Sequence, residues 1–326
     1  MKMPKKMQYL LAGMAASVCL LAQAQAQSYP DRTVRWAVPY AAGGASDIVT
    51  RIVAQRMAAN LGQPVVVENR PGAATILATD EFVLAKPDGY RILTAAGSAL
   101  TLHPELGRKL RYEAERDFDY VSGLIKLPMI MVVNKDLGIK NLPELIAYIK
   151  KANGNVSYAS VGMGSPHHLV AESFLKQIDA KATHIPYNGT MASLMDVVAG
   201  RIPFSITDLA TSSPLIKKGE LIALAVPSDA RSPVFPDVPT FNEAGTPLVG
   251  FAWHGVVVPK GTPPEIIAII NKEIVDTLND PATAKRLHDM GTEILPVTTP
   301  AQLREFVKSE RAKWGELIRS RGLTVE

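Results

Sequence analysis

The stretch VPYAAGGASD, residues 38–47, decides the fold because it joins a strand pattern directly to a helix pattern. The apolar run TVRWAVPY that leads into it is typical of a buried strand. The residues that follow repeat apolar side chains at helical spacing from Ile48 to Leu61 and stop at Gly62, a residue favoured just after a helix. The two glycines allow a tight turn, so the first N–H groups of the helix point at whatever lies above the strand end.

Strand and helix patterns alternate along the rest of the chain. Apolar, strand-like runs such as PVVVEN (64–69) and LPMIMVVNK (127–135) alternate with helical patterns such as NLPELIAYIKKANG (141–154). Continuous apolar strands between helices indicate α/β architecture with open, mostly parallel sheets that are covered on both faces. A chain of 326 residues is long enough for two such lobes.

The N-terminus, residues 1–26, has the pattern of a cleaved secretory signal peptide. The lysines of MKMPKKMQ precede an apolar run, LLAGMAASVCLLA, that is too short to span a bilayer. AQAQAQ then offers small residues for cleavage after Ala24 or Ala26. We therefore expect a periplasmic mature protein.

Cleavage would change the thiol content and the charge of the chain. It removes Cys19, the one cysteine, which excludes disulfides, zinc–thiolate sites and cysteine nucleophiles from the mature protein. It also removes three lysines, which lowers the formal charge from +4 to about +1. Because the sequence has no basic cluster, nucleic-acid binding is not expected.

A second glycine turn, SVGMGSPHH at residues 160–168, is built like the first. Ser165 is a candidate N-cap, and Pro166 suits the first helical position. Both turns place a helix N-terminus at the carboxyl end of a strand, the edge at which open α/β sheets bind ligands. Neither turn contains Lys or Arg, so we expect a carboxylate held by amides, hydroxyls and water. A glycine after a strand can serve packing alone, and the pairing of two such turns is what favours a ligand cleft.

Two acidic residues stand at predicted strand ends. For Asp47 the sequence favours helix capping, because an acid in the first turn is stabilised by the helix dipole. For Asp208, in SITDLA, it favours a place in the pocket, where the carboxylate would accept hydrogen bonds from ligand hydroxyls, an ammonium group or water.

Enzymatic interpretations of these motifs fail on spacing. AAGGAS is not the G-x-G-x-x-G of a dinucleotide fold, although Glu68 lies near the expected place of a ribose-binding acid. GMGSPHH lacks the second glycine of a nucleophile elbow, which leaves a secreted α/β hydrolase using Ser165 only as the alternative. We expect neither catalysis nor a cofactor.

The adjacent histidines of the second turn do not suggest a metal site. Neighbours in a helical turn point in different directions, and the chain has no H-E-x-x-H motif. His168, at the third helical position, is the one expected to reach a ligand, whereas His167 is expected to be solvated.

Several longer pieces of the chain are specific to one family. They are YPDRTVRWAVPYAAGGASDIVTRIVAQRM, LGQPVVVENRPGA, KPDGYRIL, VSYASVGMGSPHHLVAESF, IPYNGT, LIALAVPSDARSPVFPDVPTFNEAG and VVVPKGTPPEII. Together, from about Tyr29 to the C-terminus, they resemble the Bug-type substrate-binding proteins, the extracytoplasmic receptors of tripartite tricarboxylate transporters.

The resemblance implies a periplasmic-binding-protein fold with lobe one in residues 27–125 and 251–326, lobe two in residues 126–250, and a ligand cleft between them. It implies a small carboxylate held by the two glycine turns, membrane permease subunits as partners, and no catalysis; a monomer is the default. Matched position by position, the ligand-binding residues are Tyr40, Ala41, Gly44, Ser46 and Asp47 in the first turn, Ser160, Gly162, Gly164, Ser165 and His168 in the second, and Asp208.

The chain departs from the family in one place. After ENRPGA the family usually continues with two glycines and an asparagine, but here the chain continues with Ala74, Thr75 and Ile76. If this helix start faces the cleft, the pocket is less polar and more crowded, which favours a ligand with an apolar or aromatic body. The sequence leaves open whether binding feeds transport or signals to a membrane partner.

Overall fold

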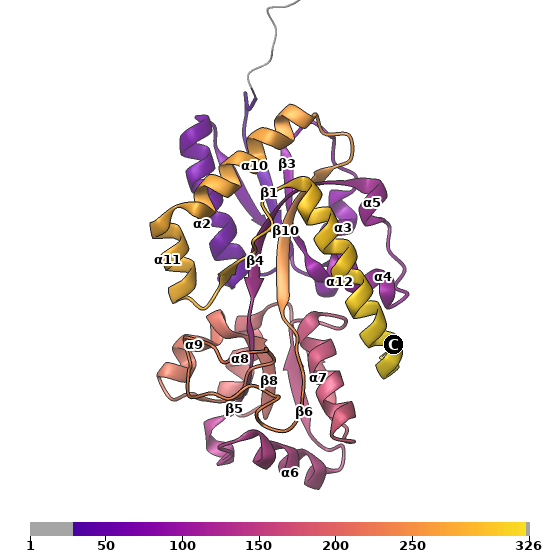
Figure 1. Ribbon diagram of the computed structural model, residues 1–326, viewed down its shortest axis with the longest axis vertical. Helices are drawn as coiled ribbons and strands as arrows, with labels where there is room; N and C mark the ends of the chain where they lie inside the picture. Colours follow the sequence, from indigo (N-terminus) through magenta and orange to yellow (C-terminus); the bar gives the residue numbers. More distant parts are fainter. Residues whose placement is uncertain (1–28, 324–326) are drawn as a thin grey trace, which may run out of the picture.

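The computed structural model describes residues 29–323, apart from the side chain of Arg321, and shows two α/β lobes stacked along the long axis of the molecule (Figure 1). The predicted fold class is confirmed. The predicted signal peptide, with Cys19, lies outside the described residues. Between residues 29 and 323, none of the helices combines the length and the apolar character that a membrane span requires.

The first lobe contains a six-stranded sheet with the order β11-β4-β10-β3-β1-β2. Its strands are β1 (Val34–Val38), β2 (Val65–Asn69), β3 (Arg91–Ala96), β4 (Phe118–Leu127), β10 (Ala252–Pro259) and β11 (Glu293–Ile294). Strand β1 pairs in parallel with β2 and β3, whereas β10 runs antiparallel to β3 and β4, and β11 antiparallel to β4. The sheet is therefore mixed, and parallel pairing is confined to one half of it.

Helices cover both faces of this sheet (Figure 1). They are α2 (Ala45–Leu61), α3 (Ile76–Phe82), α4 (His103–Glu105), α5 (Ala114–Asp117), α10 (Pro264–Asn279), α11 (Pro281–Asp289) and α12 (Pro300–Arg321), with short turns η1 (Ala73–Thr75) and η2 (Ser98–Leu102). Alternate strand residues point to opposite faces, so Trp36 joins the core beneath α2 and α10, while Leu93 joins the core beneath α3 and α12. Trp253 is also a core residue and packs edge-on against Phe306.

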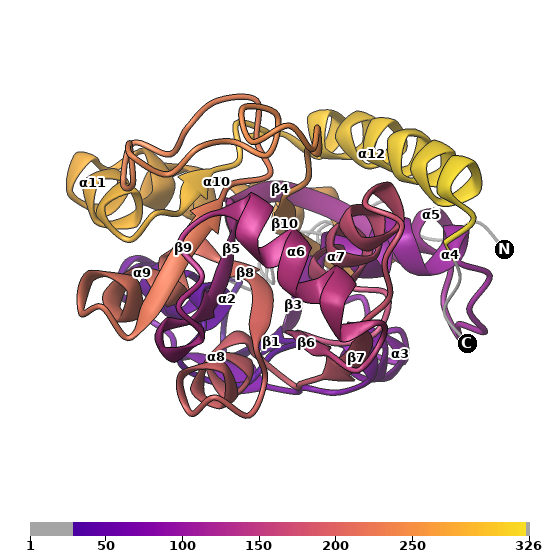
Figure 2. The same ribbon diagram turned by 90° about the horizontal axis from the view of Figure 1, so that it is seen from below.

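The second lobe repeats the plan with a five-stranded sheet in the order β7-β6-β8-β5-β9 (Figure 2). Its strands are β5 (Met129–Asn134), β6 (Ser157–Ser160), β7 (Thr183–Pro186), β8 (Phe204–Asp208) and β9 (Leu221–Ala225); its helices are α6 (Leu142–Ala152), α7 (Pro166–Gln177), α8 (Thr190–Val198) and α9 (Leu209–Lys217), and a short turn η3 spans Lys135–Leu137. Strand β6 is parallel to β7 and β8, and β5 is antiparallel to β8 and β9. This sheet is mixed as well. The expectation of mostly parallel sheets is therefore wrong, because β4, β5 and β10 run antiparallel to the strands beside them.

The chain passes from one sheet to the other between Leu127 and Met129 and returns before Ala252. The two passages lie side by side between the lobes in Figure 1, where β4 and β10 run together toward the second lobe. We propose that they form the hinge, with the lobes divided near residues 126 and 250. Helix α12 reaches across as well, because Trp314 lies beside Gly250.

The segment after β2 has an unusual backbone. Ala73, Ala74 and Thr75 have φ angles of 47°, 51° and 85°, a left-handed region that glycine enters freely but that costs other residues about 1–2 kcal/mol. Ala74 faces the opposite lobe, since a Cβ placed on Gly162 would lie 3.0 Å from the Ala74 Cβ. The departure from the family pattern therefore places a methyl group at the contact between the two lobes.

Replacing Ala74 by glycine should stabilise the protein. Relief of the left-handed strain exceeds the entropy that glycine adds to the unfolded chain, so Ala74→Gly should raise the free energy of unfolding by about 1 kcal/mol. Ala59→Gly, on the exposed face of helix α2, is the matched control and should lower that free energy by about 1 kcal/mol. Urea unfolding measures both. If Ala74→Gly instead lowers the free energy of unfolding about as much as the control does, the backbone at Ala74 is not strained.

Candidate functional site

A small cavity of about 90 Å³ lies between the two lobes. It is enclosed by the turns after β1, β6 and β7, the start of α7, the ends of β4 and β8, and the start of β10. Its lining residues are Tyr40, Ala41, Ala42, Gly44, Ala45, Ser46, Leu127, Val161, His167, Asn188, Gly189, Thr190, Met191, Ala192, Asp208, Ala252 and His254. Both lobes therefore contribute walls, and both do so with the carboxyl ends of parallel strands, where ligands bind in open α/β sheets.

Two helix N-termini meet at this cavity, those of α2 and α8. Each helix is preceded by a glycine N-cap, Gly44 and Gly189, and neither has a side-chain capping hydrogen bond. The turns face each other closely, because a Cβ on Gly189 would lie 3.3 Å from the Ala41 Cβ. The first N–H groups of a helix have no acceptor within it and carry the positive end of its dipole. The cavity is thus bounded by two groups of N–H donors that suit an anion.

Helix α7, which follows the second predicted glycine turn, is arranged differently. The Ser165 side chain caps it by accepting a hydrogen bond of 3.2 Å from the His168 N–H, and Ser165 is 2% exposed. Gly162 packs against Ala74, and Gly164 against Leu106. Because its N-terminus is capped by its own serine, α7 has fewer free donors to offer than α2 and α8.

The predicted site residues therefore divide into two groups. Those that line the cavity are Tyr40, Ala41, Gly44, Ser46 and Asp208; those that do not are Asp47, Ser160, Gly162, Gly164, Ser165 and His168. The turn at 160–168 reaches the cavity through Val161 and His167 instead. The expectation that His167 is solvated is wrong, because its side chain is buried, with 3% of the residue exposed.

Asp47 holds the first turn in shape from behind. Its carboxylate accepts hydrogen bonds from the Gly43 N–H, from Arg51 Nε and from Asn69 Nδ2, at 2.9–3.0 Å. Burial alone would raise the pKa of Asp47, but the hydrogen bonds from Arg51, Gly43 and Asn69 outweigh it and hold the pKa below its ordinary value. The ionised side chain therefore fixes the loop that presents Tyr40 and Gly44 to the cavity.

Asp208 lines the cavity and fixes two residues of the second lobe. Its Oδ1 lies 2.8 Å from His167 Nε2, and its Oδ2 accepts a hydrogen bond of 2.7 Å from the Thr190 hydroxyl. Burial by itself raises the pKa of Asp208, but the charge and hydrogen bond of His167 and the bond from Thr190 hold it below its ordinary value. The buried carboxylate thus orients the His167 ring and the start of α8.

Two imidazole nitrogens on the cavity wall lack partners. Nδ1 of His167 and Nδ1 of His254 are buried, and neither has a hydrogen-bond partner among the described residues. His254 is stacked on the Tyr40 ring, with 5.3 Å between ring centroids, and burial lowers its pKa to about 4 although Asp208 opposes the shift. Buried polar atoms in native proteins are normally paired, so these nitrogens mark the cavity as the place of a polar ligand or of ordered water.

The comparison with known families agrees with this geometry. Residues 49–323 match the family model described as the tripartite tricarboxylate transporter family receptor. The chain belongs to this receptor family. It is 34% identical to the protein BugT of Bordetella pertussis over 313 residues, which cover 95% of this chain and 94% of BugT.

Solved structures of related receptors have the same fold. The periplasmic binding protein BugD is 33% identical with a TM-score of 0.85, and the match covers 91% of this chain and all of BugD. MatC from Rhodopseudomonas palustris, solved with bound malate, is 30% identical with a TM-score of 0.84, and the match covers 89% of this chain and all of MatC. Rpa4515 from R. palustris, solved with adipate, is 28% identical with a TM-score of 0.87, and the match covers 91% of this chain and 99% of Rpa4515.

Several polar residues of the receptor's cavity are absent from the sequence-based site. They are His167, Asn188, Thr190 and His254. The motif IPYNGT contains the same strand, glycine and helix order as the opening turn, so Gly189 and Thr190 had a recognisable signal. No sequence pattern indicated His254, because it lies on β10, which is far from the glycine turns in the sequence and runs antiparallel to its neighbours.

The geometry gives no support to the enzymatic alternatives. Glu68 forms ion pairs with Arg35, Arg70 and Arg91, so it is not free to bind a ribose. The Ser165 hydroxyl caps a helix and has no imidazole partner among the described residues. Within residues 29–323 no three His, Cys, Asp or Glu side chains are grouped for a metal ion.

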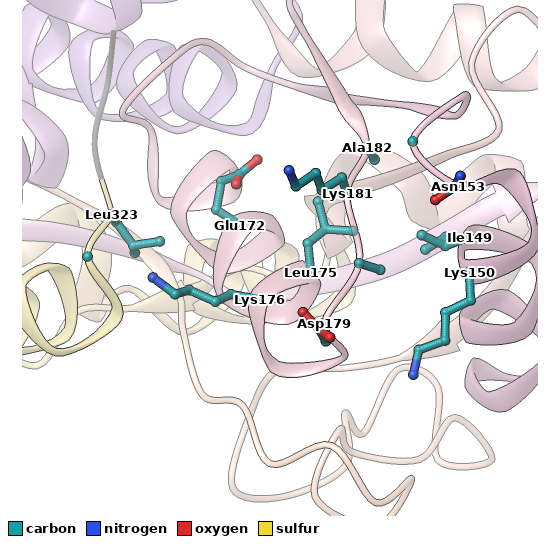
Figure 3. Close-up of a pocket in the computed structure, with 13 residues that line it drawn as sticks. Ile149, Lys150, Asn153, Glu172, Leu175, Lys176, Asp179, Lys181, Ala182 and Leu323 are labelled. Atoms are coloured by element: carbon teal, nitrogen blue, oxygen red, sulfur yellow. The ribbon is translucent and has the colours of Figure 1, made fainter.

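A larger depression, of about 850 Å³, lies on the second lobe away from both of the cavity's turns. Figure 3 shows it between the end of α6, the end of α7 and the C-terminal segment, with Lys150, Lys181 and Asp179 among its walls. It lies at the amino ends of β6 and β7, the edge opposite the one where ligands bind in open α/β sheets. We therefore place the candidate site in the smaller cavity.

Three buried histidines and the half-buried His184 should make the receptor sensitive to mild acid. Burial lowers the pKa of His103, His184 and His254 to about 4 and, with help from His184 and Arg108, that of His168 to about 3. In the unfolded chain the same groups titrate near 6.5. The unfolded state therefore binds more protons below pH 6.5, and stability falls as the pH falls from 6.5 toward 4, by about 1 kcal/mol per histidine at pH 5.5.

Urea unfolding at pH 7.5, 6.5 and 5.5 checks this expectation. Replacement of His184, whose Nε2 lies 2.6 Å from the Ser160 hydroxyl, by glutamine should flatten the decline, because glutamine does not titrate. A stability that is constant from pH 7.5 to 5.5 would show that the histidines are not held neutral by burial.

Proposed function

We propose that this receptor captures a small carboxylate in the periplasm, between the N-termini of α2 and α8, and delivers it to the permease of a tripartite tricarboxylate transporter. The observation that carries the proposal is the pair of glycine-capped N-termini that face each other across the cavity without side-chain caps. A carboxylate has two oxygens with several lone pairs, so it can accept N–H bonds from both sides at once.

The remaining groups of the cavity fit the same ligand. The Ser46 hydroxyl and the Tyr40 ring come from the first lobe, and His167 and His254 offer their unpaired Nδ1 atoms. Because Nε2 of His167 is directed at Asp208, its Nδ1 remains available to a polar group of the ligand or to a water. A carboxylate with a second polar group therefore uses both the N–H donors and the histidines.

The related structures support this class of ligand. MatC was solved with malate and Rpa4515 with adipate, and each of these ligands has two carboxylates. The signal-like N-terminus supports a periplasmic location, and the family supports a permease as the partner that receives the ligand. Receptors of this kind bind and release, so we propose no chemical step.

Binding of a carboxylate should stabilise the mature protein and should depend on Gly189. A ligand at 100 times its dissociation constant adds about 2.7 kcal/mol to the free energy of unfolding, which a thermal-shift screen of mono- and dicarboxylates detects. In Gly189→Val the backbone, already extended at φ 176°, accepts the new side chain, but its methyls occupy the space beside Ala41. The dissociation constant should rise at least about tenfold.

Ser165→Ala is the matched control. It removes the α7 cap and should lower stability by about 1 kcal/mol, yet leave the affinity for carboxylates unchanged, because Ser165 does not line the cavity. If no carboxylate shifts the melting temperature, the proposed function is wrong. If Ser165→Ala weakens binding while Gly189→Val does not, the ligand lies at α7 rather than at α8.

A further inference from the structure

A second cavity adjoins the first on the side of helices α9 and α11. Its volume is about 400 Å³, and it shares the lining residues Ala45 and Met191 with the carboxylate cavity. Both lobes form its walls, α2 and α11 from the first and α8 and α9 from the second. It therefore lies next to the proposed site, between the same two lobes.

The walls of this second cavity are mainly apolar. Ile48, Met191, Ala210, Pro214 and Met290 contribute aliphatic or thioether surface. The charged residues of the lining, Lys217 and Asp289, are both exposed and opposite in sign, so the pair presents no net charge. The cavity therefore suits an uncharged body rather than a second anion.

One polar group in this cavity lacks a partner. Thr211, on α9, is 8% exposed, and its hydroxyl has no hydrogen-bond partner among the described residues. A buried hydroxyl without a partner costs free energy, which a ligand atom that accepts or donates a hydrogen bond would recover. The space beside Gly43 is also open, since a Cβ there would meet no atom within 4 Å.

The volumes of the two cavities also indicate a ligand that occupies both. Ligand pockets in proteins usually span roughly 300–1,000 Å³. The carboxylate cavity, at about 90 Å³, is below this range, whereas the two cavities together fall within it. A ligand that fills the site therefore extends past Ala45 and Met191.

We propose that the second cavity is a subsite for the apolar body of the ligand, an aliphatic chain of about five or more carbons or an aromatic ring, whose carboxylate lies between α2 and α8. This subsite rests on the proposed function, because it takes the carboxylate position as given. Met191 lies at the junction of the two cavities and separates the polar end of the ligand from the apolar end.

Isothermal titration of the mature protein with the straight-chain monocarboxylates from propanoate to octanoate, and with 3-phenylpropanoate, tests the subsite. Each buried methylene should tighten binding about fourfold until the cavity is filled. In Ala210→Leu the new side chain enters the subsite, so the gain with chain length should disappear while propanoate binds as before. Ala230→Leu, the same substitution at a separate cavity by the hinge, is the control and should keep the gain.

The outcomes separate the two proposals. If short and long carboxylates bind equally well to the unmodified chain, the subsite is wrong and the carboxylate receptor stands. The subsite is also wrong if Ala230→Leu, and not Ala210→Leu, abolishes the gain, because the body would then occupy the cavity by the hinge. If no carboxylate of any length binds, the proposed function fails, and the subsite fails with it.

Discussion

The arrangement of the molecule depends on N–H groups that two helices leave unpaired. Helices α2 and α8 begin at glycines whose lack of a side chain removes the usual cap, and both begin at the carboxyl end of a parallel strand. Burying these groups in a small cavity without an acceptor is costly. The two lobes therefore hold, on opposite sides of the cleft, N–H donors that need an acceptor and that suit an anion best.

The buried acids of the site stabilise its walls rather than compete with the anion for its donors. Asp47 uses its oxygens on the first turn and on Arg51, and Asp208 uses both of its oxygens on His167 and Thr190. Each carboxylate is already paired, so its charge is partly neutralised where a second anion approaches. This explains how a cleft with acidic residues near it and no lysine or arginine in its lining can still suit a carboxylate.

The sequence predicts the strand–turn–helix units well because each is a local pattern. Residues 34–62 form the strand, the glycine turn and the helix expected of them, and Asp47 accepts a hydrogen bond from the Gly43 N–H in the turn before the helix. The second wall of the site was predicted less well, since two similar turns compete for it. Both turns reach the cavity, but which of α7 and α8 leaves its first N–H groups uncapped there depends on how Ser165 and Gly189 begin their helices and on the strand order, which is a property of the whole fold. The same holds for His254, which arrives on a strand from the distant end of the chain.

The contact between the lobes links the change at Ala74 to the closing of the cleft. Ala74 touches the turn at Gly162, and Arg108 of the first lobe donates a hydrogen bond of 2.9 Å to the Met163 carbonyl of the second. Neither contact involves the cavity, so both favour closure whether or not a ligand is present. A ligand can shift an equilibrium between arrangements of the lobes only through its own differential contacts with them, and at the proposed site those contacts come from α2 and α8. The strained segment around Ala74 therefore lies at a contact that holds the lobes together, whereas the glycine-capped helices bound the cavity between them.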